Sequence, residues 1–275
     1  MTLCPLPVEG GTVAQEQLPL AGKVAIVTGG GKGLGKAMAL ALAEAGADVA
    51  VGARTQSDID AVAVSIRSLG RRAIAVPTDV TQSAQIDNLV QRTIAELGQV
   101  DVLINNAGGG APGKPIWEIT DEEWLYGLNL NLSSTFWGAR AVLQHMTERK
   151  SGKIINLSSG WGYRGNRFAF MYCSTKAGII NLTRTLAITY AEDNIQVNCI
   201  APGSFPHLER LPEERREALV ARGSRQPMGR FGEDEEIGQA AVFLACEESS
   251  YVTGHVLTVD GGWSGTMYDP GFEER

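Results

Sequence analysis

Ser159, Tyr172 and Lys176 bring three side chains capable of acid–base chemistry into one short stretch. Tyr172 and Lys176 are four positions apart, so on a helix they share one face. A free phenol titrates near ~10, and an adjacent ammonium favours the phenolate, so we expect Lys176 to lower the pKa of Tyr172 into the range of a general acid/base. Ser159 follows the apolar run 154–157, which predicts a buried strand whose end presents a hydroxyl to a substrate oxygen. Together they suit interconversion of a carbonyl and an alcohol.

The tyrosine–lysine spacing alone is weak evidence, because any tyrosine has roughly a one in fifteen chance of a lysine four places on. The chemistry also needs a hydride carrier. A binding site for such a carrier must therefore be recognisable elsewhere in the chain.

The segment 24–45 provides one. A short apolar run at 24–27 predicts a strand, residues 28–35 read T-G-x-x-x-G-x-G, and an alanine- and leucine-rich helix follows. Glycines let the backbone approach a pyrophosphate, and the helix N-terminus offers free amides and a partial positive charge. The predicted cofactor-binding residues of this loop are Thr28, Gly29, Lys32, Gly33, Leu34 and Gly35.

The second predicted strand, 48–54, ends where an adenosine ribose should lie. An acidic residue there would favour NAD, but the chain has Ala53 and Arg54. Arg54 and Lys32 can both reach a 2′-phosphate, so we expect NADP(H), with NAD(H) as the alternative.

The alternation of strands and helices continues along the chain. Helices are expected over about 57–69 and 83–97, and strands over 73–76, 102–104, 195–200 and 256–259. Strands separated by such helices pair in parallel through right-handed crossovers, so we predict a single-domain, doubly wound α/β fold of the Rossmann type. Further cofactor contacts are expected at the glycine turn that ends the strand 102–104, from Asn106, Ala107 and Gly108.

Composition excludes several functional classes. The net charge of −7 and the absence of a basic run argue against nucleic acid and anionic membranes as partners. Four scattered cysteines and three dispersed histidines favour free thiols and no metal site. No leader and no run of eighteen apolar residues appears, so a cytoplasmic protein is expected.

From about Lys23 to Trp263 the chain resembles the classical short-chain dehydrogenase/reductase family. The matching motifs are the glycine loop, D-V at 79–80, N-N-A-G at 105–108, Asn131, Ser159, Y-x-x-x-K at 172–176, P-G at 202–203 and D-G-G at 260–262. The resemblance implies that Tyr172 is the acid/base, that Lys176 lowers its pKa and holds the nicotinamide ribose, and that Ser159 polarises the substrate oxygen. It adds Asp79, Val80, Pro202 and Gly203 to the expected cofactor contacts. It also implies a homotetramer.

Asn131 falls within a long helix expected over 121–148, where asparagine is a poor helix former. The resemblance implies that a local distortion there holds a water in a proton relay. A surface asparagine is the alternative.

The resemblance implies that residues 204–225 form a flap over the substrate. Residues 1–19 are expected to be an extension outside the domain 20–275. His207 stands where many relatives have a threonine, so a contact with the nicotinamide amide is open. Arg164 and Arg167 lie where a substrate wall is expected; they could bind an anionic substrate, or be solvated or contact another subunit.

The sequence therefore predicts an NADP(H)-dependent carbonyl reductase or alcohol dehydrogenase, of the group that contains oxoacyl-carrier-protein reductases and sugar dehydrogenases. Two rivals remain. One is an NAD-dependent sugar or steroid alcohol dehydrogenase, and the other is a catalytically silent nucleotide-binding regulator, which should have lost one of Asn131, Ser159, Tyr172 or Lys176.

Overall fold

A computed structural model describes residues 18–110, 113–206, 212–213, 216–218, 223 and 226–265. The expected extension up to residue 17, most of the expected flap and His207 lie outside these residues. No helix among the described residues is long and apolar enough to cross a membrane.

Seven parallel strands form one sheet in the order β3-β2-β1-β4-β5-β6-β7. The strands are β1 Val24–Thr28, β2 Asp48–Ala53, β3 Ala73–Pro77, β4 Val102–Asn105, β5 Gly152–Leu157, β6 Ile195–Pro202 and β7 Val256–Val259. Strand order reverses between β1 and β4, the switch point at which open α/β sheets bind ligands. The predicted parallel, doubly wound sheet is confirmed.

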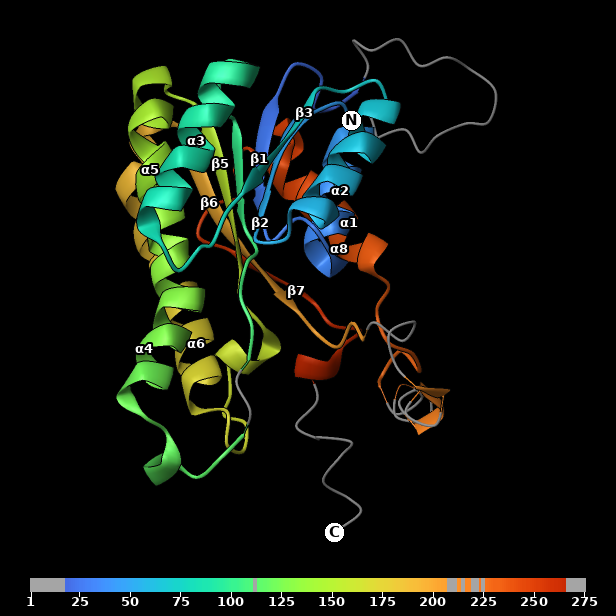
Figure 1. Ribbon diagram of the computed structural model, residues 1–275, viewed down its shortest axis with the longest axis vertical. Helices are drawn as coiled ribbons and strands as arrows, with labels where there is room; N and C mark the ends of the chain where they lie inside the picture. Colours follow the sequence, from blue (N-terminus) through green and yellow to red (C-terminus); the bar gives the residue numbers. More distant parts are fainter. Residues whose placement is uncertain are drawn as a thin grey trace.

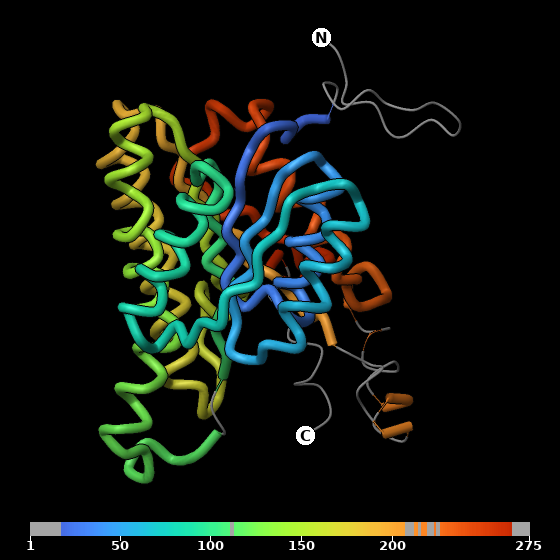
Figure 2. The backbone as a smooth tube through the Cα atoms, turned by 45° about the horizontal axis from the view of Figure 1, so that its top comes forward, coloured from blue at the N-terminus to red at the C-terminus, as the bar shows by residue number. Residues whose placement is uncertain are grey.

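Helices cover both faces of the sheet (Figure 1). One layer contains α1 Gly33–Glu44, α2 Gln56–Ser68 and α8 Asp234–Ala245, and the other contains α3 Ser83–Leu97, α5 Ser134–Arg149 and α6 Phe170–Tyr190. Figure 2 shows the three layers from another direction, with the green and yellow helices of 83–190 on one side and the blue and orange helices on the other.

Each face of the sheet has its own apolar core. On one face, buried residues such as Met38 of α1 and Ile59 of α2 pack against strand residues such as Val49. On the other, Leu89 of α3 and Val142 of α5 belong to a second cluster. β1 is completely buried, as expected for a central strand with helices on both faces. The two cores fix the strand ends that carry the polar residues described below.

The long helix expected over 121–148 is interrupted. It consists of α4 Asp121–Leu128, a π-helical segment Asn129–Ser133, and α5. A π segment inserts extra backbone into the helix and often occurs at functional sites.

Candidate active site

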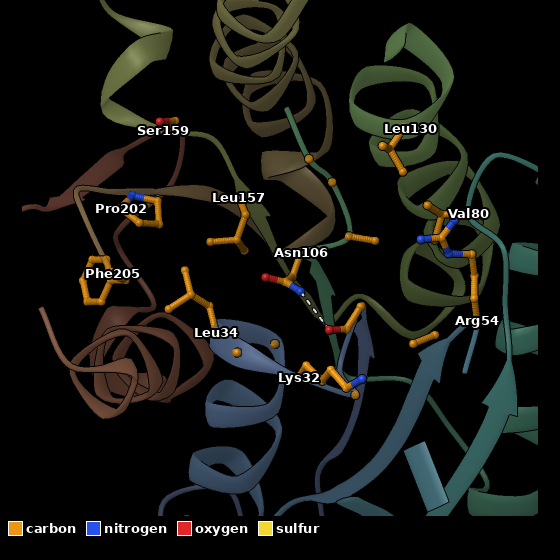
Figure 3. Close-up of a pocket in the computed structure, with 18 of the residues that line it drawn as sticks. Lys32, Leu34, Arg54, Val80, Asn106, Leu130, Leu157, Ser159, Pro202 and Phe205 are labelled. Atoms are coloured by element: carbon orange, nitrogen blue, oxygen red, sulfur yellow. Dashed lines mark hydrogen bonds between the residues drawn. The ribbon is translucent and has the colours of Figure 1, made fainter. Parts of the chain in front are cut away.

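A pocket of about 520 Å³ lies along the carboxyl ends of the strands. In Figure 3, Arg54 and Val80 lie toward one end, Ser159, Pro202 and Phe205 toward the other, and Asn106 between them. Every predicted site residue lines this pocket except Thr28 and Asn131, which are hydrogen-bonded to loops that line it. The lining residues that were predicted are Gly29, Lys32, Gly33, Leu34, Gly35, Arg54, Asp79, Val80, Asn106, Ala107, Gly108, Ser159, Tyr172, Lys176, Pro202 and Gly203.

The glycine loop is held against the turn that follows β4. Thr28 is buried at the end of β1, and its hydroxyl accepts hydrogen bonds from the amides of Asn106 at 3.0 Å and Ala107 at 3.2 Å. The Asn106 side chain donates to the carbonyl oxygen of Thr28 at 2.9 Å. Gly29 has φ +66°, and a Cβ there would lie 2.8 Å from the Asn106 side-chain nitrogen. A larger residue would therefore separate the two loops.

α1 begins directly behind the glycine loop. Its N-cap residue Lys32 has extended backbone, and no side-chain hydrogen bond caps the helix. The amides of the first turn consequently face the pocket with the positive end of the helix dipole, an arrangement suited to a pyrophosphate. The geometry of the loop and the size of the pocket fit a dinucleotide.

The adenosine end of the pocket contains a carboxylate that the sequence reasoning missed. The Lys32 ammonium lies 2.8 Å from Asp58, which belongs to the first turn of α2 and also lines the pocket. Lys32 is therefore already paired, whereas no ion pair joins Arg54 to any described residue. Asp58 has no sequence signal of its own, because only the β2–α2 turn brings it beside the glycine loop. Asp79, at the same end, accepts from both the amide and the hydroxyl of Thr81.

Tyr172, Ser159 and Lys176 converge at the other end. Ser158 and Ser159 follow β5, and their side chains point in different directions. The Ser158 hydroxyl donates to the Lys176 carbonyl at 2.7 Å. The Ser159 hydroxyl faces Tyr172 and accepts from the Trp161 amide at 3.2 Å. The Lys176 ammonium lies 5.5 Å from the centre of the Tyr172 ring and donates to the Leu157 carbonyl at 2.8 Å.

The expected depression of the Tyr172 pKa is wrong for this structure. Burial raises the pKa of Tyr172, and the hydrogen bond with Ser159 opposes the rise only in part. Lys176 is itself buried, which lowers its pKa to about 8. Desolvation is therefore the largest influence on the Tyr172 pKa, and Tyr172 stays protonated at neutral pH.

Asn131 is fully buried in the π-helical segment, so the surface alternative is wrong. Its side chain accepts from the Gly109 amide at 3.1 Å and donates to the carbonyl oxygens of Gly109 and Gly127, both at 3.0 Å. A Cβ at Gly108 would lie 2.8 Å from the Asn131 oxygen. The distortion expected at this residue is present, and Asn131 clamps the loop after β4 beside Lys176.

A second cavity, of about 300 Å³, borders the Tyr172 ring between α4 and the start of α6. It shares Leu130 and Tyr172 with the first pocket. Its lining residues are Gly110, Lys114, Ile119, Glu123, Tyr126, Leu130, Phe168, Ala169, Phe170, Met171 and Tyr172.

The arginines expected near the substrate have protein partners. Arg164 lies 4.6 Å over the Trp263 ring and donates to the Ser264 carbonyl at 2.8 Å. Arg167 lies 4.8 Å over the Phe168 ring. Arg164 thus connects the loop after Ser159 to the turn that follows β7.

Elsewhere in the described chain, no group of three or more histidine, cysteine or acidic residues could hold a metal ion. Cys173, Cys199 and Cys246 are free thiols. Cys4 lies outside the described residues.

Comparisons with known proteins agree with this geometry. Residues 29–264 match the family model described as enoyl-(acyl carrier protein) reductase. The chain is 40% identical over 207 residues to the cis-4-hydroxycyclohexanecarboxylate dehydrogenase of Sinomonas cyclohexanicum, covering 74% of this chain and 82% of the relative. It is 38% identical to the 3-oxoacyl-[acyl-carrier-protein] reductase of Thermotoga maritima, covering 88% and 98%. A crystal structure of a putative short-chain alcohol dehydrogenase from Sinorhizobium meliloti superposes with a TM-score of 0.85 at 36% identity, covering 91% and 99%.

Proposed function

The chain belongs to the short-chain dehydrogenase/reductase family and is an oxidoreductase of carbonyl and alcohol groups, and we propose that it transfers a hydride between NADP(H) and its substrate with Tyr172 as the acid/base. The observation that supports this most is the convergence of Tyr172, Ser159 and Lys176 at one end of a pocket whose other end is a glycine loop at a helix N-terminus.

The roles follow from the environment of each side chain. A nicotinamide cofactor supplies or accepts the hydride when bound. In reduction, Tyr172 donates the proton, because its raised pKa keeps the phenol protonated at neutral pH. Ser159 holds the substrate oxygen close to that phenol, and the Lys176 ammonium contributes positive charge near the oxygen that becomes negative. Asn131 positions the loop after β4 and, with a water, would relay a proton from solvent toward Lys176 to replace the one that Tyr172 donates.

The cofactor preference depends on two opposing charges. Arg54 is exposed at the adenosine end, and Ala53 leaves room for a phosphate beside it. Asp58 already neutralises Lys32 and repels a 2′-phosphate. Only one of the two expected cations is therefore fully available, and one partly exposed charge-assisted pair corresponds to roughly a tenfold preference for NADP(H).

NAD(H) is the second candidate, and Asp58 is the observation that favours it. Its carboxylate accepts hydrogen bonds, as an unphosphorylated ribose requires. The substrate remains a small carbonyl or alcohol compound. The relative from Sinomonas acts, by its name, on the hydroxyl of a six-membered ring that also carries a carboxylate, and a ring alcohol or ketone is the first substrate to assay.

Association with other copies of the chain is also part of the proposal. α5 and α6 expose Phe136 and Ile188, the latter 80% exposed, and β7 is one of the two edge strands of the sheet. Exposed apolar side chains on neighbouring helices are typical of surfaces that are covered in an assembly. We expect a homotetramer, which sedimentation velocity can measure.

Replacing Tyr172 by phenylalanine tests the proposed reaction. The variant should lose at least ~10²-fold in kcat, the usual size of a lost acid/base, and should bind the reduced cofactor almost normally. Turnover is measured from the nicotinamide absorbance with a panel of cyclic ketones and alcohols, and binding from nicotinamide fluorescence. Wild-type activity in the variant would show that another group transfers the proton. The same panel with both cofactors in the wild-type protein excludes the silent regulator if any compound is turned over.

A further inference from the structure

The second cavity continues the reaction site into an apolar space. α4 runs beside the first turns of α6 (Figure 1), and the cavity of about 300 Å³ between them has the Tyr172 ring in its wall. Pockets of this size are at the small end of those that hold ligands. A compact body therefore fits it better than a long chain.

Aromatic side chains make the walls of this cavity. Tyr126 comes from α4, and Phe168 and Phe170 come from the segment that leads into α6. Phe168 has φ +61°, a left-handed conformation that is strained for a phenylalanine and that tends to persist at ligand sites. The loop after β4 passes closely over it, since a Cβ at Gly113 would lie 3.1 Å from the Phe168 Cβ. Flat rings on several sides suit a flat or ring-shaped ligand.

The two charged side chains that line the cavity form an ion pair with each other. Lys114 and Glu123 are the charged residues among its described lining, and their ammonium and carboxylate lie 2.6 Å apart. Glu123 also accepts from the Thr120 amide at 2.9 Å, in the capping box that begins α4. A carboxylate entering this space would meet a paired lysine and the negative charge of Glu123. Burying it there without a partner is costly.

Arg164 is not available to compensate such a charge. Its guanidinium is stacked on Trp263 and hydrogen-bonded to Ser264, and it does not line the cavity. Arg164, one of the two arginines expected to bind an anionic substrate, is therefore not free to do so.

We infer that the substrate carries an uncharged, compact ring, alicyclic or aromatic, which occupies the cavity between α4 and residues 168–172 while its carbonyl or hydroxyl group meets Tyr172. The inference rests on the proposed function and adds the substrate class: neutral ring ketones and the corresponding secondary alcohols, rather than carboxylates.

A pair of ketones of similar size and different charge tests the preference for a neutral ring. Methyl 4-acetylbenzoate and 4-acetylbenzoate share the ring and the acetyl group, and the neutral methyl ester of the first stands where the second has a carboxylate. With each nicotinamide cofactor, kcat/KM for the ester should exceed that for the acid by at least about tenfold. Equal values, or a preference for the acid, would overturn the inference and leave the proposed reaction intact. Turnover of no ketone, and of no corresponding alcohol, would overturn the proposed function itself.

Filling the cavity with a larger side chain tests whether the substrate ring binds there. Tyr126→Trp adds volume to the wall, whereas Leu125→Trp puts the same side chain on the same helix at a residue that is 56% exposed and outside the cavity. Tyr126→Trp should raise the KM for acetophenone about tenfold or more and leave the KM for acetone unchanged. Leu125→Trp should change neither KM value. A Tyr126→Trp protein that handles acetophenone like the wild type, or loses both ketones equally, would contradict this location.

Calorimetry gives a result that does not depend on turnover. Binding of acetophenone to the wild-type protein with oxidised cofactor, a combination that cannot react, should show a negative heat-capacity change, the mark of apolar burial. Tyr126→Trp should weaken this binding about tenfold, and Leu125→Trp should not. Wild-type affinity in Tyr126→Trp would place the ring elsewhere.

Discussion

Lys176→Met should stabilise the protein while removing its activity, because the lysine is buried as a charge. Burial lowers the pKa of Lys176 from 10.5 to about 8. A difference of about 2.5 pKa units corresponds to about 3 kcal/mol by which folding disfavours the charged form. The substitution also removes the hydrogen bond to the Leu157 carbonyl, which costs about 1–2 kcal/mol. The net gain expected at neutral pH is about 1–2 kcal/mol, or a few degrees in Tm.

The stability advantage of Lys176→Met should depend on pH. Between about pH 8 and pH 10.5 the unfolded chain keeps the proton on Lys176 and the folded protein has lost it. The destabilisation by Lys176 is therefore complete below pH 8 and disappears as the pH rises toward 10.5. The advantage of Lys176→Met should be largest at neutral pH and should shrink under alkaline conditions.

Urea unfolding at neutral pH and near pH ~10 measures both effects, with Lys36→Met as the control. Lys36 is an exposed lysine on α1, and its substitution should show no such pH dependence. A Lys176→Met protein that is less stable than the wild type at neutral pH, or whose advantage is the same at both pH values, would refute the reasoning.

Two further predictions concern pH and cofactor. Oxidation of an alcohol needs the phenolate, and the Tyr172 pKa is raised, so the oxidation rate should increase roughly tenfold per pH unit from neutral to alkaline pH. The reduction rate should stay level and then decline over the same range. Initial rates in both directions, with chemistry rate-limiting, measure this, and a level oxidation profile would contradict it. Arg54→Ala should lower kcat/KM with NADPH about tenfold relative to NADH, and Asp58→Asn should raise the same ratio by releasing Lys32. A ratio that neither substitution changes would show that these charges do not contact the cofactor.

The sequence was sufficient for the sheet and for most of the pocket. Apolar runs between glycine turns placed the strands within about two residues, because a strand buried on both faces has a continuous apolar signal. Carboxyl ends of parallel strands meet at one edge, so motifs far apart in the chain could be assigned to one pocket. The motifs at 28–35, 105–108 and 172–176 all line or support it.

The remaining features depend on three-dimensional packing. The π-helical segment at 129–133 has no distinctive composition, so a helix without interruption was predicted there. Asp58 reaches Lys32 only because the turn after β2 folds back over the glycine loop. The direction of the Tyr172 pKa depends on how deeply the phenol is buried, and residue spacing carries no information on burial. α8, which covers α1, was not predicted as an element at all.

The contact between Trp161 and Trp263 gives the protein an optical signal at its reaction site. The two rings lie 4.8 Å apart at 74°, one in the turn that Ser159 begins and the other in the turn after β7. Indoles at this distance couple their excited states, so we expect the pair to produce a circular-dichroism couplet whose intensity depends on their separation. Any ligand that displaces the Ser159 loop from the C-terminal turn will change that couplet. The native chain can thus report, without a label, whether the loop moves when substrate binds.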